Sequence, residues 1–378
     1  MTPPAVAPPR RPSRALLCFS HLRWSWVYQR PQHLLTRAAR DRPVYFLEEP
    51  EYADGTPEMW QQEVAPNVTV LRPRIPAGVT AEFAVAWQRQ LLDDWLSTAR
   101  ITPDVLWYYT PAALSFSHHL EARMIVYDCM DELAAFAGAP AALPLLERQL
   151  LSRCHVVFTG GMSLYEAKAS LHGNCHVMPS SVDVPHFRRA RQRGAHPMLL
   201  RTIPSPRIGY SGVLDERLDL ELMGAVADAR PAYQFVFVGP VTKIDPGALP
   251  RRANVHYVGA VPYDTLPECM SGWQAAWMPF ALNAATRYIS PTKTPEYLAA
   301  GLPVVSTPIQ DVVRTWGTTG LVRIGASASD VSQALDAAMQ DRDPLRLARI
   351  DRALSSLSWD ATWQRMSDVM ARSAAFAA

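Results

Sequence analysis

Short apolar runs recur along the chain, separated by polar turns or by stretches with helical periodicity. An apolar run of about four to eight residues bounded by turn residues indicates a buried strand, and strands alternating with helices are typical of parallel α/β units. Helices are clearest at 82–98 and 143–152. Strands are predicted at 15–20, 43–47, 105–109, 124–128, 155–159 and 176–179 in the first half, and at 207–210, 234–238, 254–258, 275–279 and 303–306 in the second.

The two series of strands predict two doubly wound, Rossmann-like α/β domains, since 378 residues exceed one ordinary core. We place the first domain at 15–188 and the second at 207–357, joined by a basic, Pro-rich linker at 189–206. The Pro- and Arg-rich tail, 1–14, is expected to be disordered. Because ligands bind beyond the carboxyl ends of the strands in such sheets, we expect the two domains to face each other across a cleft.

The last segment, 358–378, is predicted to be an amphipathic helix. Trp359, Trp363, Met366 and Met370 recur there at helical spacing and give the helix an aromatic face. A membrane-surface helix would have a more basic polar face than this one. We therefore expect the helix to pack back on the first domain.

Composition and charge exclude several classes of protein. Apolar residues make up 48% of the chain and charged residues 19%, and the net charge of +2 argues against a dedicated nucleic-acid binder. The five cysteines are scattered without a C-x-x-C pair, which indicates buried thiols in a reducing compartment. No apolar run approaches the ~18 residues of a membrane span, and the N-terminus lacks the apolar stretch of a signal peptide. We expect a cytoplasmic protein, with contact between the basic run 188–193 and an anionic membrane surface as an alternative to a simple linker.

The segment 274–307 carries the strongest functional signal. It predicts a buried strand, a polar loop, a short helix opening at a Ser-Pro or Thr-Pro pair, and a second buried strand. Pro suits the first helical position, and a helix start offers free N–H groups and a positive dipole end to a phosphate. Lys293 lies in that turn, and Glu296 one turn further is placed to accept the hydroxyls of a ribose. The alternatives are a surface lysine and a glutamate that merely complements the helix dipole.

The order of motifs resembles that of the retaining GT-B glycosyltransferases of the large group called family 4. The fragments that carry the resemblance are HVMPSSVDVPHF (176–187), FVFVGPV (235–241), NVHYVGAVPYDTLPECMSGWQAAWMPF (254–280) and PEYLAAGLPVVST (295–307). The opening FSHLRWSWVYQRPQHLL and the run YDCMDEL resemble one subgroup, the teichuronic-acid and capsular polysaccharide transferases. The resemblance implies a first domain that binds the acceptor and a second that binds a UDP- or GDP-sugar donor.

The resemblance also implies which residues bind the donor. They are Gly212, Arg217, Gly239, Pro240, Ser290, Pro291, Thr292, Lys293 and Glu296. Arg217 and Lys293 are further expected to be catalytic, since fixed cations stabilise charge growing on the leaving nucleotide. The alternative for Arg217 is a surface residue paired with Glu216 or Glu221, and that for the two glycines is a tight turn after a strand.

One position departs from the family pattern. The donor motif of the family has two glutamates eight positions apart, the second on the ribose and the first near the donor sugar. Glu296 matches the second, but Tyr288 stands in place of the first. The ribose contact is therefore carried over to this chain, and the role of the first glutamate is not.

In the first domain, VYDCMDEL ends a predicted strand that should point at the cleft. Asp128 is expected to be catalytic, either orienting an acceptor hydroxyl or lying near the anomeric carbon, and Asp131 to bind the acceptor. The alternative is an Asp N-cap for the helix that follows.

The loop at 20–34 corresponds to the family's first N-domain loop, which borders the acceptor. Its expected acceptor contacts are His21, Arg23, Trp24 and Arg30, because an indole stacks on a sugar face and arginine binds phosphate. Core packing is the alternative for the aromatic residues of this loop.

We expect neither a metal ion nor another cofactor, since the histidines lack metal-binding spacing and the D-x-D at 341–343 lies far from any strand end. The expected function is transfer of a sugar from a nucleoside-diphosphate sugar to a saccharide or lipid-linked acceptor in bacterial surface polysaccharide synthesis, with retention. A nucleotide-sugar epimerase and a non-catalytic nucleotide-sugar-binding subunit of an assembly complex are the alternatives.

Overall fold

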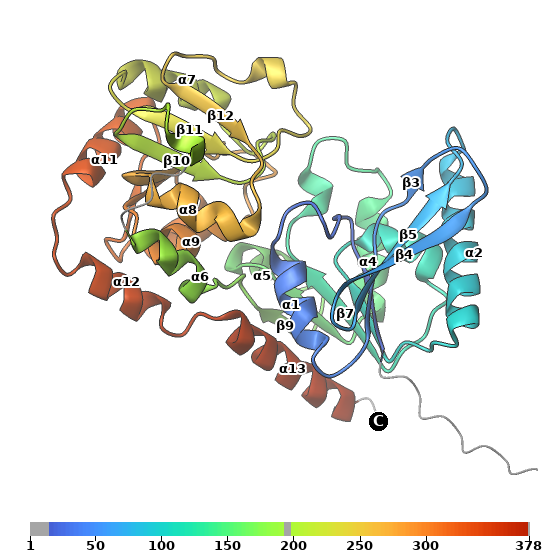
Figure 1. Cartoon of the computed structure of the whole chain (residues 1–378). Coiled ribbons are helices and arrows are strands. Elements are labelled where there is room, and N and C mark those ends of the chain that lie inside the picture. Colours follow the sequence, from blue (N-terminus) through green and yellow to red (C-terminus); the bar gives the residue numbers. More distant parts are fainter. Residues whose placement is uncertain (1–14, 193–197, 377–378) are drawn as a thin grey trace, which may run out of the picture. The chain divides into compact units, whose positions relative to one another are not determined.

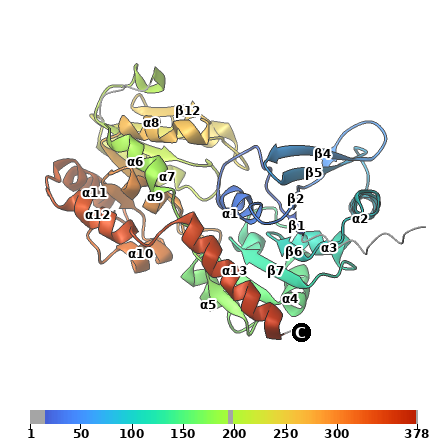
Figure 2. The same cartoon turned by 60° about the horizontal axis from the view of Figure 1, so that its bottom comes forward.

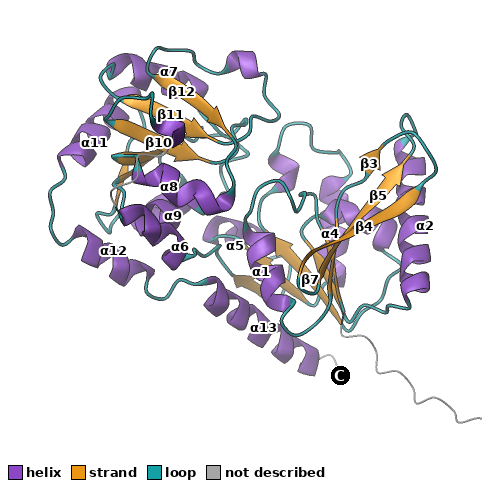
Figure 3. Ribbon diagram, viewed as in Figure 1, coloured by secondary structure: helices purple, strands orange, loops and turns teal. Residues whose placement is uncertain are grey.

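The computed structural model describes residues 15–192 and 198–376, which form two largely parallel sheets (Figures 1 and 3). The predicted tail at 1–14 and part of the predicted linker, 193–197, lie outside the described residues. The first sheet has nine strands in the order β3-β5-β2-β1-β6-β7-β8-β9, with β4 paired to β5. The second has six, in the order β12-β11-β10-β13-β14-β15.

Strands of the first sheet alternate with helices along the chain except at 44–75, where four strands follow one another. Its strands are β1 (Leu16–Phe19), β2 (Val44–Leu47), β3 (Glu51–Tyr52), β4 (Glu58–Ala65), β5 (Val68–Ile75), β6 (Val105–Tyr108), β7 (Met124–Cys129), β8 (Val156–Thr159) and β9 (Cys175–Val177). The helices of this half are α1 (Arg30–Ala38), α2 (Ala81–Ala99), α3 (Leu114–Ser117), α4 (Leu143–Arg153), α5 (Met162–Lys168) and α6 (Val184–Arg188).

In the second sheet an α-helix follows every strand except the one at 234–238. Its strands are β10 (Arg207–Ser211), β11 (Gln234–Val238), β12 (Val255–Gly259), β13 (Ala275–Met278), β14 (Val304–Ser306) and β15 (Val322–Ile324). The helices are α7 (Leu220–Ala229), α8 (Leu266–Ser271), α9 (Lys293–Ala299), α10 (Gln310–Trp316), α11 (Ala328–Gln340), α12 (Arg346–Leu354) and α13 (Trp359–Phe376). Helices α7 and α11 pack together on one face of this sheet, and α8 and α9 lie on the other (Figure 1).

Every strand and both helices predicted from the apolar runs are present, and their bounds agree within two residues. The apolar runs predict these strands well because parallel strands covered by helices are apolar on both faces. All residues of β1, β6, β7, β8, β10 and β13 are buried.

The sequence missed β3, β4, β5 and β15. Strands β4 and β5 form an antiparallel pair turned at Asn67, which has a φ of 60°. Charged and amide side chains are common in the largely exposed β4, and β5 carries Arg72 and Arg74 at partly exposed positions, with a buried Pro73 between them. Because only one face of this pair is covered, by α2 (Figure 2), its residues do not form a continuous apolar run.

The contacts divide the described chain into two compact units. The first contains 15–129, 142–157 and the end of α13 from 367 on, and the second contains 130–141 and 158–366 apart from 193–197. The short segment 130–141, which follows β7, thus makes its contacts within the second unit. The predicted C-terminal helix is present as α13, and its residues up to Met366 belong to the second unit.

Candidate nucleotide site

The strand order of the second sheet reverses between β10 and β13, so this is the point at which a ligand is expected beyond the carboxyl ends of the strands. Two glycines follow strands there. Gly212 after β10 has a φ of 148°, and Gly239 after β11 has a φ of 149°, a region that favours glycine. A Cβ atom on Gly239 would lie 1.9 Å from the carbonyl oxygen of Gly212. The two turns therefore pack backbone against backbone, which no side chain at 239 would allow.

Backbone hydrogen bonds join the loops that follow these glycines. The N–H of Leu214 donates to the carbonyl of Pro240 at 2.9 Å, and the N–H of Thr242 donates to the carbonyl of Leu214 at 3.0 Å. This bridge extends the β10–β11 pairing by one step. Lys243 comes next, with a φ of 60° and an exposed side chain.

Lys293 is the first residue of α9, and its side chain crosses the Gly212 turn. A Cβ atom on Gly212 would lie 2.1 Å from Cε and 2.7 Å from Nζ of Lys293, so the ammonium occupies the space that this glycine leaves. Nζ also lies 5.9 Å from the centroid of the Tyr210 ring. The Lys293 side chain thus packs against the first glycine turn.

The start of α9 differs from the prediction. Its N-cap is Thr292, which has helical φ and ψ and makes no capping bond with its side chain. Pro295 is the third helical residue and Pro291 precedes the helix, so neither proline stands at the first position. Pro is tolerated in the first turn because the N–H groups there have no carbonyl partner in the helix.

Glu296 lies one turn beyond Lys293 and is half-buried. Burial raises the pKa of Glu296 to about 7, and the nearby Lys293 ammonium only partly opposes that rise. Burial likewise lowers the pKa of Lys293, opposed by the Glu296 carboxylate. Tyr297 fixes this helix to β10, because its buried hydroxyl accepts the N–H of Ser211 at 2.7 Å. The predicted phosphate and ribose residues therefore lie together, on an anchored helix.

Arg217 is held by a neighbour that the sequence analysis did not pair with it. Its guanidinium donates to the buried Asp215 in a fork, with Nε–Oδ1 at 2.9 Å and Nη2–Oδ2 at 2.6 Å. Burial alone would lower the pKa of Arg217, but the Asp215 carboxylate outweighs it and raises that pKa. The alternative of a pairing with Glu216 or Glu221 is not what the structure shows, and Glu216 instead accepts the N–H of Ala137 at 3.1 Å.

The segment 130–141 completes this cluster of charges. Asp131 lies in the field of Arg217, Lys293 and Lys243, and these three cations partly offset the rise in its pKa that burial causes. Phe136 lies under two cations, with Cζ of Arg217 at 5.7 Å and Nζ of Lys243 at 4.8 Å from its ring centroid. Asp131, predicted as an acceptor contact, thus lies in the field of two predicted donor residues, Arg217 and Lys293, and of Lys243.

Ser290, at the end of the donor loop, packs on a glycine turn. A Cβ atom on Gly161 would lie 2.7 Å from Cβ of Ser290 and 2.2 Å from Oδ2 of Asp311. The buried Asp311 accepts both the N–H and the hydroxyl of Ser163, at 3.1 Å and 2.5 Å, and so caps α5 from α10. Asp311, Lys243 and Phe136 had no signal in the sequence, because their roles depend on contacts between distant segments.

Two predicted site residues of the first unit, Asp128 and Arg30, bind each other. Asp128 is completely buried in β7 and accepts a two-pronged contact from the buried Arg30, with Nε–Oδ2 at 3.0 Å and Nη2–Oδ1 at 2.8 Å. Burial raises the pKa of Asp128, and Arg30 opposes that rise. Asp128 is also no N-cap, since Glu132 precedes the next short helix. This placement favours a structural ion pair and lends no support to a catalytic role for Asp128 or to acceptor binding by Arg30.

The loop after β1 is anchored by Glu48, a buried residue at the end of β2. Glu48 accepts the N–H of Trp24 at 2.7 Å and a guanidinium contact from Arg23 at 3.2 Å. The Trp24 ring meets Phe46 edge to face at 5.1 Å. His21, Arg23 and Trp24 are all half-buried. The structure therefore gives this loop a fixed conformation, and the acceptor roles of its residues stay a prediction.

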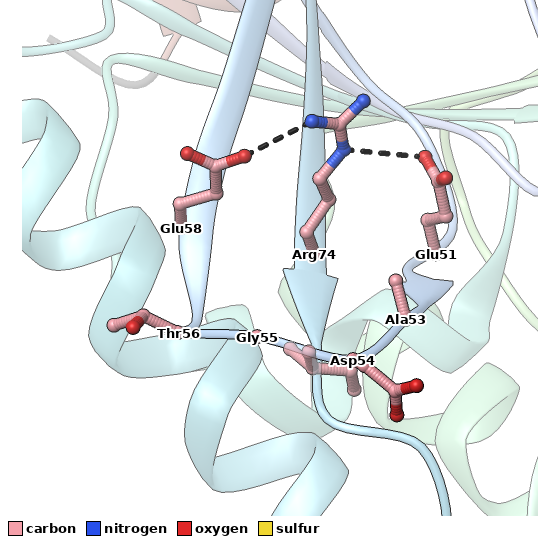
Figure 4. A pocket seen from close by; sticks show the side chains of 8 residues that line it. Glu51, Ala53, Asp54, Gly55, Thr56, Glu58 and Arg74 are labelled. Carbon is pink, nitrogen blue, oxygen red and sulfur yellow. Dashed lines mark hydrogen bonds and ion pairs between the residues drawn. The ribbon is translucent and has the colours of Figure 1, made fainter.

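A small polar pocket of about 150 Å³ lies in the first unit beside β3, β4 and β5 (Figure 4). Arg74 spans it, donating to Glu51 at 3.4 Å and to Glu58 at 3.0 Å. None of the predicted site residues lines it. Within 15–192 and 198–376, no group of three or more His, Cys, Asp or Glu residues is placed to hold a metal ion. No helix of those same ranges is long and apolar enough to cross a membrane.

Residues 205–341 match the family described as glycosyl transferases group 1. The match runs from β10 to the end of α11 and includes Gly212, Arg217, Lys293 and Glu296. This part of the chain is therefore a glycosyl transferases group 1 domain, and the charged cluster described above lies at its strand ends.

Among curated proteins, the chain is similar to TuaH of Bacillus subtilis (strain 168), a protein assigned to teichuronic acid biosynthesis as a glycosyltransferase. The two are 25% identical over 218 residues, which is 53% of this chain and 55% of the relative. The match thus spans about half the length of each protein.

Solved structures of similar fold cover nearly the whole chain. A sucrose-phosphate synthase from Thermosynechococcus elongatus has a TM-score of 0.72 at 14% identity, covering 95% of this chain and 99% of its own. A trehalose-6-phosphate structure from E. coli has 0.68 at 13%, covering 94% and 99%, and the catalytic domain of starch synthase IV from Arabidopsis thaliana has 0.66 at 9%, covering 97% and 100%. At these identities the likeness shows the fold, which is GT-B, as predicted.

Proposed function

We propose that this chain is a glycosyltransferase that moves a sugar from a nucleoside-diphosphate sugar to a saccharide or lipid-linked acceptor. The observation that carries the proposal is the convergence of Lys293, Arg217 and Glu296 on the two glycine turns of a glycosyl transferases group 1 domain. Ligands of doubly wound sheets bind where the strand order reverses, and that is where these residues meet.

The donor's ribose is proposed to lie on Glu296 and its diphosphate on Lys293 and Arg217. A carboxylate accepts two ribose hydroxyls, and a half-buried ammonium or guanidinium neutralises phosphate charge far better than an exposed one. Gly212 lets the backbone approach the diphosphate closely, because it has no Cβ atom. Ser290, Pro291 and Thr292 lie next to Lys293 in the chain, at the start of α9. Gly239 packs against the Gly212 turn, and the carbonyl of Pro240 accepts the N–H of Leu214.

In the proposed reaction the acceptor hydroxyl attacks the anomeric carbon while the bond from that carbon to the diphosphate oxygen breaks. The leaving nucleoside diphosphate gains one negative charge, which Lys293 and Arg217 stabilise. The hydroxyl proton passes to a phosphate oxygen. No side chain acts as nucleophile in this scheme, and Asp128 has no part in it. Cationic side chains supply the charge stabilisation, so the scheme needs no divalent ion.

Retention of configuration and a place in bacterial surface polysaccharide synthesis belong to the proposal. The assignment of TuaH to teichuronic acid biosynthesis supports the second point. The donor's base is left open between UDP- and GDP-sugars. One structural neighbour was solved with UDP-2-fluoro glucose and another with ADP, so the shared fold does not select a base.

The test is a transfer assay on the purified chain with labelled UDP- and GDP-sugars and a bacterial lipid and saccharide extract as acceptor. We expect release of the nucleoside diphosphate together with label in the acceptor, and a loss of about a hundredfold or more in Lys293→Ala. Arg251→Ala removes one exposed cation of the same unit and should leave the rate unchanged. Transfer at the same rate in Lys293→Ala would contradict the site assignment.

A non-catalytic nucleotide-sugar-binding subunit is the second candidate, and Tyr288 is the observation that favours it. Where the family motif has a glutamate near the donor sugar, this chain has a half-buried phenol with the guanidinium of Arg287 5.3 Å from its ring centroid. Nucleotide binding without turnover in the wild type, and turnover in Tyr288→Glu, would establish this alternative. An epimerase would convert the donor sugar without any acceptor, which analysis of the sugar product detects.

A further inference from the structure

Lysine is rare in this chain, and its few occurrences are clustered in space. Only three of the 37 lysine and arginine residues are lysines. Lys243 and Lys293 both act on Asp131, and Lys168 pairs with the adjacent Glu132 at 2.6 Å. Lysine presents a compact point charge on a flexible stem, whereas arginine presents a fixed fork. A chain that uses arginine almost everywhere thus places its lysines around one short segment.

Lys243 has a backbone conformation that its side chain does not favour. Its φ of 60° is a left-handed conformation, which is unfavourable for a residue with a Cβ atom. Such conformations persist where neighbouring contacts over-determine them, and they gather at ligand clamps. Here the neighbouring contacts are the two hydrogen bonds between the Leu214 loop and residues 240 and 242. They set the start of the Lys243 loop beside the loop that carries Arg217.

Phe136 aligns Lys243 with Arg217. The ring centroid lies 4.8 Å from Nζ of Lys243 and 5.7 Å from Cζ of Arg217, so one aromatic ring holds both cations. The guanidinium of Arg217 forms a two-pronged ion pair with Asp215, whereas the Lys243 side chain is exposed. Lys243 is therefore able to meet a phosphate oxygen without first breaking an ion pair.

We propose that Lys243 is a further ligand of the donor diphosphate, supplied by the loop after β11 and aimed by Phe136. This inference rests on the proposed function, because it needs a nucleoside diphosphate at the switch point of the second sheet. It explains how a site whose first loop offers a single, already paired arginine gathers enough positive charge for two phosphates. Lys293 and Lys243 then approach the diphosphate from two different loops.

Calorimetric titration with inorganic pyrophosphate, and with the nucleoside diphosphate that binds the wild type, tests the proposal. A charge-assisted contact to phosphate leads us to expect a loss of about tenfold or more in the affinity of Lys243→Ala for both ligands. Lys243→Arg should recover most of it. The affinity for the nucleoside monophosphate should fall less than that for the diphosphate. Arg251→Ala is the matched control, since it also removes an exposed cation from this unit.

A double-mutant cycle with Phe136→Leu tests the aiming role of the ring. If Phe136 acts through Lys243, removing both residues should cost less binding free energy than the two single losses added together. Strict additivity would contradict the aiming role. The variants also change an exposed side chain and a half-buried ring, so thermal unfolding of each free protein verifies that it is folded.

The outcomes separate this inference from the proposed function. If the wild type binds a nucleoside diphosphate and Lys243→Ala binds it equally well, the role of Lys243 is wrong and the donor site stands. If the wild type binds neither pyrophosphate nor any nucleoside diphosphate, both fall together. A tenfold loss in Lys243→Ala with none in Arg251→Ala supports both.

Discussion

Nucleotide binding by this chain should depend on pH through Glu296, and replacement by glutamine should remove that dependence. Burial raises the pKa of Glu296 to about 7. The ionised carboxylate accepts hydrogen bonds from both ribose hydroxyls, while the protonated form has lost part of that capacity. About one-tenth of the side chains are ionised at pH 6 and about nine-tenths at pH 8, so the affinity for a nucleotide should rise by up to about tenfold over that range.

The raised pKa of Glu296 also makes the stability of the folded protein depend on pH. A carboxyl with a raised pKa binds its proton more tightly in the folded protein than in the unfolded chain. Its contribution is therefore fully present below its usual pKa of 4.5, is lost as the pH rises to about 7, and changes no further above that. The shift corresponds to a cost of roughly 3 kcal/mol at most for keeping the ionised group in place. Glu296→Gln should then be more stable than the wild type above pH 7.

Calorimetric titration between pH 6 and 8 measures the first effect, and denaturant unfolding of the free protein measures the second. The nucleotide itself titrates near pH 6 through its terminal phosphate, so the comparison with Glu296→Gln is essential. We expect the variant to bind the nucleotide weakly. Its affinity should change with pH only as far as the phosphate of the nucleotide titrates. An identical pH profile in wild type and Glu296→Gln would refute the ribose contact.

Three further variants have definite expected outcomes. Gly239→Ala should destabilise the protein by about 3 kcal/mol or more in denaturant unfolding, because its Cβ would meet the Gly212 carbonyl at 1.9 Å in a left-handed conformation; a change below 1 kcal/mol would contradict the packing of the two turns. Asp128→Ala should destabilise by about 3–5 kcal/mol, since it leaves Arg30 buried without its partner, and a fully stable but inactive variant would instead restore the catalytic role. Asp131→Asn should tighten pyrophosphate binding by about threefold or more in calorimetry, because it removes a negative charge that faces three cations; weaker binding would show that Asp131 organises them instead.

The sequence predicted the elements that are apolar on both faces and the donor segment that follows them. Strand β13, the loop after it and α9 were readable because they are continuous in the chain. The pair β4–β5 was not predicted, since polar residues on its uncovered face, among them Arg72 and Arg74, interrupt the apolar run. Local patterns thus predict covered strands better than edge strands.

The partners of the charged side chains could not be predicted from the sequence. Asp128 ends a buried strand and looked available for catalysis, but Arg30, 98 residues earlier, neutralises it inside the unit. The ion pair of Arg217 with Asp215 was not predicted, because a side chain two residues away reaches the guanidinium only through the particular bend of that loop. Lys243 and Phe136 meet across more than a hundred residues, and only the fold brings them together.

A thermal-shift screen of UDP, GDP, ADP and dTDP on wild type and Glu296→Ala tests the central claim most directly. A ligand that binds only the folded protein raises the melting temperature by mass action. The account predicts stabilisation of the wild type by one of these nucleotides and its loss in Glu296→Ala. No shift with any nucleotide at millimolar concentration would contradict the donor site at the end of β10 and β13.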